Sequence, residues 1–161
     1  MDKISPCLWF NGNAEEAVNY YVSVFPDSKI ETIARWPMDR EKPAPARKGD
    51  VLAIDFTLGG KPYKALNGGV DFPFTEAISL VWVCKDQAEI DKYWNRLVGD
   101  GGQEVVCGWL KDKYGLCWQI APQMIYDLIA DKDTAKAARA MTAMMQMVKL
   151  DVAKLEAAAK G

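Results

Sequence analysis

The chain has 161 residues, half of them hydrophobic, which is enough apolar material for the core of one ordinary domain and excludes an intrinsically disordered chain. Lysine and arginine number 20 against 22 aspartates and glutamates, so the basic excess of a nucleic-acid-binding protein is missing. Histidine is absent, which excludes Ser-His and Cys-His catalytic systems and every histidine-containing metal site.

The first predicted elements are an apolar strand at 4–10 and a helix at 14–25. Apolar residues recur every three or four positions through the second segment, as in an amphipathic helix. Asn13 and Glu16 have the form of a capping box at its start, and Pro26 ends it. This segment therefore predicts a strand followed by a well-delimited helix.

In the rest of the first half of the chain, only strands are predicted. Gly59-Gly60 is a typical hairpin turn between two of them. The polar, proline-containing segment 37–49 is a loop of a length usual for lids or flexible surface. The predicted strands are 29–36, 51–58 and 62–67.

A second passage repeats this order after a connection at 68–75. An apolar strand at 77–84 precedes a helix that Asp86 and Glu89 cap and that Gly99 ends. Strands at 103–110 and 116–121 follow, with a short piece at 111–114. Each half of the chain thus predicts a βαβββ unit.

The two passages superpose at an offset of 73 residues, which indicates an internal duplication. Asn13 falls on Asp86 in this superposition, and Trp9 falls on Trp82. The equivalence of the two tryptophans favours a symmetric packing role for both.

Residues 131–160 are rich in alanine, lysine and methionine. A helical stripe of apolar side chains is expected to pack on the domain or on a second subunit, and Asp151 is expected to cap a last helix that ends at Ala159. The stripe consists of Ala138, Met141, Met145 and Val148, with Met144 alongside.

The predicted fold class is α+β, with two tandem βαβββ modules and a C-terminal helical extension. Residues 1–130 are expected to form a single domain, with modules at about 1–70 and 74–124. Residues 131–161 form the extension.

The passages LWFNGNAEEAVNYYVSVFPDSKI, ALNGG followed by FPFTEAIS, and CGWLKDKYGLCWQI carry a family resemblance, as does MTAMMQMVKLDVAKLEAA in the tail. In these passages the chain resembles the PhnB-like branch of the vicinal oxygen chelate superfamily, which includes glyoxalase I and the bleomycin-resistance proteins. Members of this branch often carry the label 3-demethylubiquinone-9 3-methyltransferase. The resemblance implies curved sheets around a cleft, usually in a homodimer.

Metal enzymes of this superfamily place four histidine or glutamate ligands on the strands that line the cleft. Carried over to this chain, the four positions fall on Pro6, Ser79, Gln119 and near Asn67. None of these side chains is a good transition-metal ligand. We therefore expect no metal and no cofactor, and we expect binding of a small organic ligand or metal-independent catalysis in the cleft between the modules.

Strand alternation places Cys117 and Gln119 on one face, which the resemblance assigns to the cleft together with Ser79, and Trp118 on the other face under a helix. Asn67 and Gln119 either orient a polar ligand or satisfy local backbone groups, and the sequence leaves both roles open.

Two tryptophans near strand ends, Trp36 and Trp109, are further candidates for a ligand pocket. Asp55 is either a buried base or, as we favour, an exposed residue at a sheet edge. The charged run Lys111, Asp112 and Lys113 is expected to lie on an exposed, solvated turn.

Two other functions remain open: an S-adenosylmethionine-dependent methyltransferase, as the family label suggests, or a drug-sequestering dimer. The Gly-Gly pairs lie at hairpins or loops and form no GxGxxG motif at a strand-to-helix turn.

The sequence shows no secretory signal, no apolar run long enough for a membrane span and no CxxC motif among its four cysteines. We expect a cytoplasmic protein with free thiols that binds neither nucleic acid nor membranes and forms a homodimer.

Overall fold

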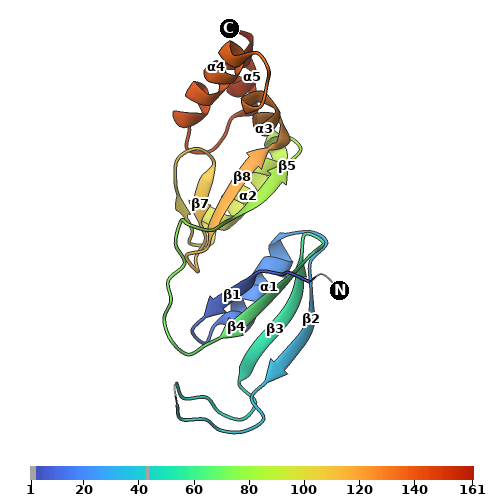
Figure 1. The fold of residues 1–161 in the computed structure, drawn as a ribbon, viewed down its shortest axis with the longest axis vertical. Helices are drawn as coiled ribbons and strands as arrows, with labels where there is room; N and C mark the ends of the chain where they lie inside the picture. Colours follow the sequence, from blue (N-terminus) through green and yellow to red (C-terminus); the bar gives the residue numbers. More distant parts are fainter. Residues whose placement is uncertain (1–2, 43) are drawn as a thin grey trace. The chain divides into compact units, whose positions relative to one another are not determined.

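The computed structural model describes residues 3–42 and 44–161, and the chain divides into two compact units, Met1–Pro73 and Phe74–Gly161. Each unit contains one βαβββ repeat, as predicted (Figure 1). The first unit holds β1 (Cys7–Phe10), α1 (Ala14–Val24), β2 (Lys29–Arg35), β3 (Val51–Leu58) and β4 (Lys61–Asn67). The second unit holds β5 (Ser79–Cys84), α2 (Gln87–Gly99), β6 (Gln103–Glu104), β7 (Trp109–Lys111), β8 (Cys117–Pro122), α3 (Gln123–Ile129), α4 (Thr134–Met145) and α5 (Val152–Lys160).

The first sheet has the strand order β1-β4-β3-β2, with β1 parallel to β4 and the other pairs antiparallel. Helix α1 packs on one face of this sheet, and burial of the apolar side chains between them supplies the core of the unit. The strand side chains on that face that are buried include Leu8, Phe10, Ile54, Phe56 and Ala65. The helix contributes Ala17, Val18 and Tyr21.

The predicted cap of helix α1 is wrong. The Asn13 side chain makes no capping hydrogen bond, because its backbone (φ −107°, ψ 18°) departs from the extended conformation of a capping residue. The Asn67 side chain, at the end of β4, caps the helix instead. Its Oδ1 accepts hydrogen bonds from the backbone N–H groups of Gly12 (3.1 Å) and Ala14 (3.0 Å). In α2 the predicted cap is confirmed, since Asp86 Oδ1 accepts from Glu89 N at 2.9 Å.

Two glycines after β4 allow close packing. A Cβ on Gly68 would lie 1.7 Å from the Trp9 ring, and a Cβ on Gly69, whose φ is +75°, would lie 2.4 Å from the Cβ of Ala44. Ala44 is buried. The predicted loop at 37–49 thus lies against the end of β4, with Pro43 outside the described residues.

The second sheet has the order β5-β8-β7-β6, and α2 packs on one of its faces. The predicted strand at 103–110 is wrong in its middle, because the chain turns at Cys107 (φ 62°) and Gly108 (φ 79°). Their N–H groups donate to Met147 O (2.7 Å) and Val148 O (2.8 Å) of the tail instead of to a strand.

The predicted equivalence of Trp9 and Trp82 is also wrong. Trp9 lies on the face of its sheet that points away from α1, and its Nε1 donates to Val70 O at 2.7 Å. Trp82 lies on the face of its sheet that packs against α2, where its ring contacts Tyr93 at a centroid distance of 5.3 Å.

A difference in linker length explains this change of face. Residues 11–13 join β1 to α1, whereas only residues 85–86 join β5 to α2. Side chains along a strand alternate between the two faces of the sheet. When the two helices are aligned, the one extra residue in the first linker therefore places Trp9 and Trp82 on opposite faces of their sheets.

Asp112 is buried, with 3% of its surface exposed, so its predicted place on a solvated turn is wrong. Its Oδ1 accepts from the backbone N–H groups of Tyr114 (2.8 Å) and Leu116 (3.1 Å), and its Oδ2 accepts from Trp118 Nε1 (2.9 Å). The carboxylate therefore closes the turn between β7 and β8 from inside.

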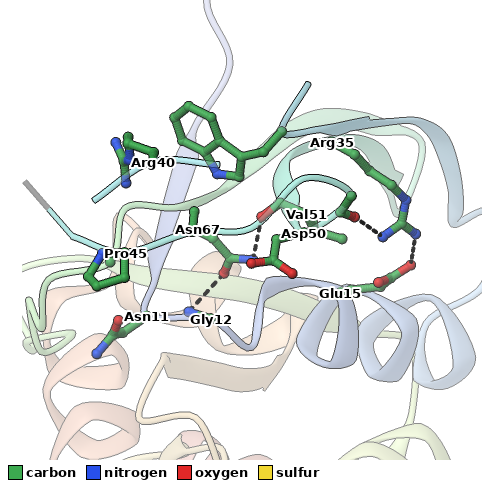
Figure 2. A pocket seen from close by; sticks show the side chains of 13 residues that line it. Asn11, Gly12, Glu15, Arg35, Arg40, Pro45, Asp50, Val51 and Asn67 are labelled. Carbon is green, nitrogen blue, oxygen red and sulfur yellow. Dashed lines mark hydrogen bonds and ion pairs between the residues drawn. The ribbon is translucent and has the colours of Figure 1, made fainter. Parts of the chain in front are cut away.

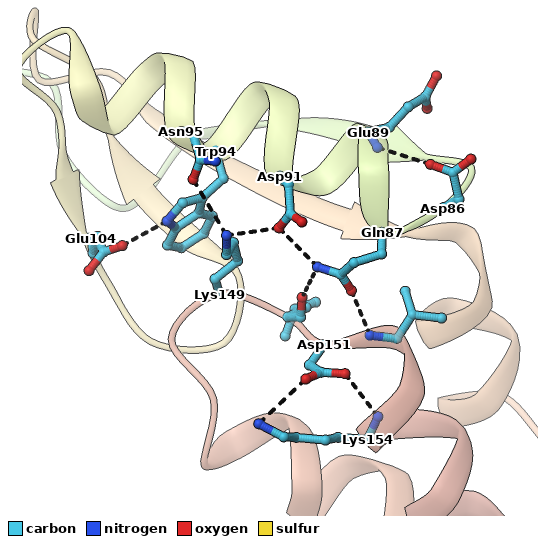
Figure 3. Close-up of polar contacts among 12 residues, drawn as sticks. Asp86, Gln87, Glu89, Asp91, Trp94, Asn95, Glu104, Lys149, Asp151 and Lys154 are labelled. Atoms are coloured by element: carbon cyan, nitrogen blue, oxygen red, sulfur yellow. Dashed lines mark hydrogen bonds and ion pairs between the residues drawn. The ribbon is translucent and has the colours of Figure 1, made fainter.

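The tail is attached to the second unit by apolar and polar contacts. Leu150 and Leu155 pack with Ala121 and Ile125 of β8 and α3, a helix that the sequence analysis did not predict. Figure 3 shows Gln87 of α2 at the centre of the polar contacts. Its Nε2 donates to Leu150 O (3.2 Å) and its Oε1 accepts from Val152 N (2.9 Å).

The predicted stripe on the tail does not pack on its own unit. Met141, Met145 and Val148 are 37%, 64% and 43% exposed, and Val148 lies beyond the end of α4. Helix α4 instead buries Ala140 and places Ala143 and Met144 against the core of the unit. The last helix begins after Asp151, whose Oδ1 accepts from Lys154 N, as predicted.

No helix within the described residues combines the length and the apolar character that a membrane span requires.

Candidate functional site

The face of the second sheet that points away from α2 joins three of the predicted site residues. Gln119 of β8 lies between Val81 of β5 and Trp109 of β7 in the strand register, and Ser79 lies two residues before Val81. The Nε2 of Gln119 donates a hydrogen bond to the Oγ of Ser79 at 2.9 Å. We call the face formed by Ser79, Val81, Val83, Trp109 and Gln119 the open face.

Apolar side chains on the open face remain in contact with solvent. Val81 is 47% exposed and Val83 46% exposed, although both belong to a strand paired along its length with β8. Valines in this position usually lie under another layer of protein or a ligand. The open face therefore offers apolar area for a flat molecule and, at Gln119 and Ser79, polar groups that could orient it.

An ion pair stands beside this face. Lys111 of β7 pairs with Glu76, which precedes β5. The hydrogen bond between them raises the pKa of Lys111 and lowers the pKa of Glu76. Both groups therefore stay charged at neutral pH, and neither is suited to act as a general base or acid there.

Cys117 lies in the same strand alternation as Gln119 but is buried. Desolvation by burial raises the pKa of its thiol, and burial raises the pKa of Cys84 to about 12. These thiols are protonated at neutral pH and are poor nucleophiles.

The four positions at which the superfamily places metal ligands do not form a metal site in this chain. Pro6 precedes β1 and its carbonyl accepts from Lys64 N, while Asn67 caps α1. Ser79 and Gln119 are hydrogen-bonded to each other, and all four side chains are neutral. The described residues include no group of three or more Cys, Asp or Glu that could hold an ion. This donor set does not fit a transition metal.

The other two predicted site residues line a pocket in the first unit. Trp36 and Asn67 belong to the wall of a cavity of about 450 Å³. Figure 2 shows Arg35 and Glu15 at one end and Arg40, Asn11 and Pro45 at the other. The remaining lining residues are Gly12, Ala46, Gly49, Asp50, Val51 and Gly69.

The Asn67 amide is largely occupied by backbone groups. Besides its bonds to the start of α1, its Nδ2 donates to Val51 O at 3.0 Å. Of the two roles that the sequence left open for Asn67, these contacts favour satisfaction of local backbone groups.

Asp55 lies on β3, an inner strand, so the predicted sheet-edge position is wrong, but its side chain is solvent-exposed as expected. It faces Lys64 and accepts from Thr32 Oγ1 at 3.2 Å. The hydrogen bond from Lys64 lowers the pKa of Asp55, which makes it an ion-pair partner and a weak base.

The sequence analysis did not identify Arg35, Arg40 or Glu76 as residues near a site. Each comes from a segment that reads as an exposed strand end or loop, and long-range packing alone brings it to its place. A run of polar residues in a long loop is the one signal that the sequence offers for Arg40.

The family model described as 3-demethylubiquinone-9 3-methyltransferase matches residues 2–121. A solved structure from Bacillus cereus, named as a 3-demethylubiquinone-9 3-methyltransferase, PhnB protein, is 35% identical with a TM-score of 0.64. The match covers 75% of this chain and 98% of that one. No curated protein matches the chain.

Two further structures share the fold at low identity. Protein PA1353 from Pseudomonas aeruginosa is 20% identical with a TM-score of 0.59, and the match covers 76% of this chain and 98% of that one. The fosfomycin resistance protein FosX from Listeria monocytogenes, solved with Mn(II) and sulfate, is 11% identical with a TM-score of 0.53; the match covers 80% of this chain and 97% of that one. These likenesses confirm the glyoxalase/bleomycin-resistance type of fold.

Proposed function

Because the chain belongs to the 3-demethylubiquinone-9 3-methyltransferase family, we propose that it binds a small, flat organic molecule on the open face of its second sheet, without a metal ion. One observation carries this proposal: the hydrogen-bonded pair of Gln119 and Ser79 stands among exposed apolar side chains on a sheet face. Such a combination of apolar area and few polar groups is typical of small-molecule sites.

The chemistry of the face favours an aromatic ligand with a hydroxyl or carbonyl group. Val81 and Val83 offer contact area to a ring, and the half-buried Trp109 offers a second flat surface. The Gln119 amide oxygen can accept from a phenol while the Ser79 hydroxyl donates to a carbonyl. A phenol can make the first of these hydrogen bonds and a quinone the second.

Calorimetry with catechol, guaiacol and 1,4-benzoquinol on the full chain tests the proposal. At least one of these compounds should bind with a Kd below about 1 mM, and Gln119→Leu should weaken binding about tenfold, the loss of one hydrogen bond. Gln123→Leu, on the exposed surface of α3, is the matched control and should leave the affinity unchanged. Equal affinity in wild type and Gln119→Leu would exclude the open face as the site.

S-adenosylmethionine-dependent methyl transfer is a second candidate, favoured by the description of the family. The turn between β1 and α1 does not fit this cofactor, because the N–H groups of Gly12 and Ala14 already bond to Asn67. Calorimetry with S-adenosylmethionine decides the matter: the proposal of a cofactor-free binding protein expects no heat of binding at 1–2 mM ligand (on the order of weak non-specific contact).

We also propose a homodimer that covers the exposed apolar side chains of the tail, Met141, Met145 and Val148. Light scattering should give twice the chain mass for the full chain, and Met141→Glu with Met145→Glu should halve it. Ala135→Glu, in the exposed first turn of α4, is the control. A monomeric full-length chain would contradict this proposal.

The cysteines at 7, 84, 107 and 117 are all free thiols. A reducing compartment such as the cytoplasm is the proposed location.

A further inference from the structure

The cavity in the first unit is lined by an arginine, Arg40, whose Nε has no hydrogen-bond partner among the described residues. The guanidinium of Arg40 lies over the Trp36 ring, with its Cζ 4.2 Å from the ring centroid. Its Nε is buried and has no hydrogen-bond partner among the described residues. A buried N–H donor without an acceptor is uncommon in folded proteins and calls for an explanation.

Each of the other charged groups of the cavity has a hydrogen-bond partner. Arg35 donates to Glu15 Oε1 at 2.8 Å and to Gly49 O at 3.2 Å, so these two charges neutralise each other. The Asp50 carboxylate accepts from the backbone N–H of Arg47 at 2.6 Å. Arg40 is therefore the lining cation that, within the described part of the chain, has neither an ion-pair partner nor a bond for its Nε.

The backbone holds Arg40 in this place. Arg40 and Ala46 exchange two backbone hydrogen bonds of 2.8 Å across the loop, and Ala44 packs on Gly69 between them. The cation–π contact with Trp36 holds the guanidinium over the ring. A preorganised guanidinium beside a cavity is a typical recognition group for carboxylate or phosphate.

We propose that this cavity is a second binding site, lined by other residues than the open face, which takes a small organic anion whose carboxylate or phosphate group accepts hydrogen bonds from Arg40. The cavity of about 450 Å³ suits a molecule with one or two rings. The N–H groups of Arg40 supply the charge recognition, and Asn11 and Pro45 form the wall beside it (Figure 2).

Nitrogen-15 NMR on the full chain tests this proposal, because the Arg40 Nε–H gives its own resonance. The probes are benzoate, phenyl phosphate, inorganic phosphate and the neutral benzamide. Benzoate or phenyl phosphate should move the Arg40 Nε–H resonance and the Trp36 indole N–H resonance in a saturable manner, since a charged acceptor then binds the guanidinium to which the Nε–H belongs. Benzamide should bind at least tenfold more weakly than benzoate, because it has no charge. Binding of inorganic phosphate as tight as phenyl phosphate would assign the site to the free ion, and would overturn the assignment to an organic anion.

Two variants separate the site from general charge effects. Arg40→Gln should weaken binding of the preferred anion at least tenfold. Arg47→Gln is the matched control: Arg47 lies in the same loop, pairs with Asp39 and Glu41, and does not line the cavity. Its substitution should leave the affinity unchanged.

The result does not depend on the open face. Failure of phenol or quinol binding at Gln119 leaves the predictions for Arg40 intact, because the two sets of resonances belong to different units. The absence of a saturable shift of the wild-type Arg40 Nε–H with both organic anions at 10 mM (on the order of the weakest binding that still has a meaning for a specific site) would overturn the proposal.

Discussion

Helix α1 and helix α2 hold the same position in the two repeats, but the side chains that cap them come from different parts of the chain. Asp86 caps its own helix, whereas Asn67 reaches α1 from a strand more than fifty residues later. In the first unit the cap also joins the helix to β3, because Asn67 Nδ2 donates to Val51 O. The Asn67 side chain thus links the start of the first helix to two strands of its sheet.

The two hairpins before the last strands also differ. Gly59 and Gly60, both with positive φ, form the turn between β3 and β4, and their N–H groups donate to Ser28 Oγ (2.9 Å) and Asp27 O (2.8 Å). The turn between β7 and β8 is closed by the buried carboxylate of Asp112. The repeats therefore preserve the order and pairing of their strands, while the local interactions that stabilise them have diverged.

The largest contrast is expected between the thiols of the two units. Cys7 is exposed and Cys84 is buried. Desolvation raises the pKa of both thiols, and it raises that of Cys84 to about 12. At pH 8 (roughly the usual pH of thiol assays) Cys7 should react with a disulfide reagent at least ~100-fold faster than Cys84, because both access and thiolate fraction favour it. Mass spectrometry of the labelled peptides measures both rates. Comparable rates would mean that the second unit opens readily.

The tail adds a second group of buried apolar side chains to the second unit, and the first unit has no counterpart of this tail. Leu150 is fully buried and touches the position that a Cβ on Gly108 would occupy. Leu150→Ala should lower the free energy of unfolding by about 3 kcal/mol through loss of contacts and a residual cavity. Urea denaturation measures this change. Glu156→Ala, at an exposed site of α5 outside the proposed dimer surface, should change stability by less than about 0.5 kcal/mol.

Two aspartates test the comparison of buried and exposed carboxylates. Asp112→Asn should cost about 2 kcal/mol, because an amide N–H would then face donors that now bond to the carboxylate. Asp55→Asn removes an exposed ion pair and should cost less than about 0.5 kcal/mol. Similar values for the two variants in thermal unfolding would refute the structural role of Asp112.

The caps of the two helices should rank in a definite order. Asn67→Ala removes three hydrogen bonds and should cost about 2 kcal/mol, while Asp86→Ala should cost about 1 kcal/mol. Asn13→Ala should be near neutral, because its side chain makes no capping bond. Denaturant titration of the three variants supplies the order, and a cost for Asn13→Ala above that for Asn67→Ala would reverse our assignment.

The smallest effect is expected from acid. The hydrogen bonds from Lys149 and Gln87 lower the pKa of Asp91, so its stabilising contribution is present above the ordinary carboxyl pKa and is lost as the pH falls through the lowered one. Asp91→Asn should therefore leave the second unit slightly less stable at neutral pH and remove part of its loss of stability below pH 4 (roughly the ordinary carboxyl value). If stability depended on pH in the same way in the variant and the wild type, the ion pair of Asp91 with Lys149 would not help to hold the tail on the second unit.

Local patterns predicted those features that depend on neighbours in sequence. The two repeats, the hairpin at Gly59-Gly60 and the cap at Asp86 follow from helical or strand periodicity and turn chemistry. The shared face of Ser79 and Gln119 is implied by the family resemblance and not by these local patterns.

The features that the sequence did not predict depend on contacts between distant segments. The cap from Asn67 spans 53 residues, and Asp112 is buried because Trp118 and the turn backbone surround it. Arg40 acquires its place through the packing of a long loop on Gly69. Nothing in the local pattern of these residues distinguishes them from exposed polar residues.

The last three helices lie outside the region that the family model matches. The family model ends at residue 121, within β8, so α3, α4 and α5 lie outside it. In this chain these helices pack on β8 and on the loop before β7. Their removal should therefore affect the second unit and leave the first unit unchanged.

Amide chemical-shift mapping of the full chain with the tightest-binding phenol or quinol tests the central claim, that the second sheet carries the ligand on its open face. The account predicts the largest shifts at Ser79, Val81, Trp109 and Gln119, together with a slowed exchange of the Gln119 side-chain amide. The largest shifts in the first unit, or none with any of the three compounds, would contradict it.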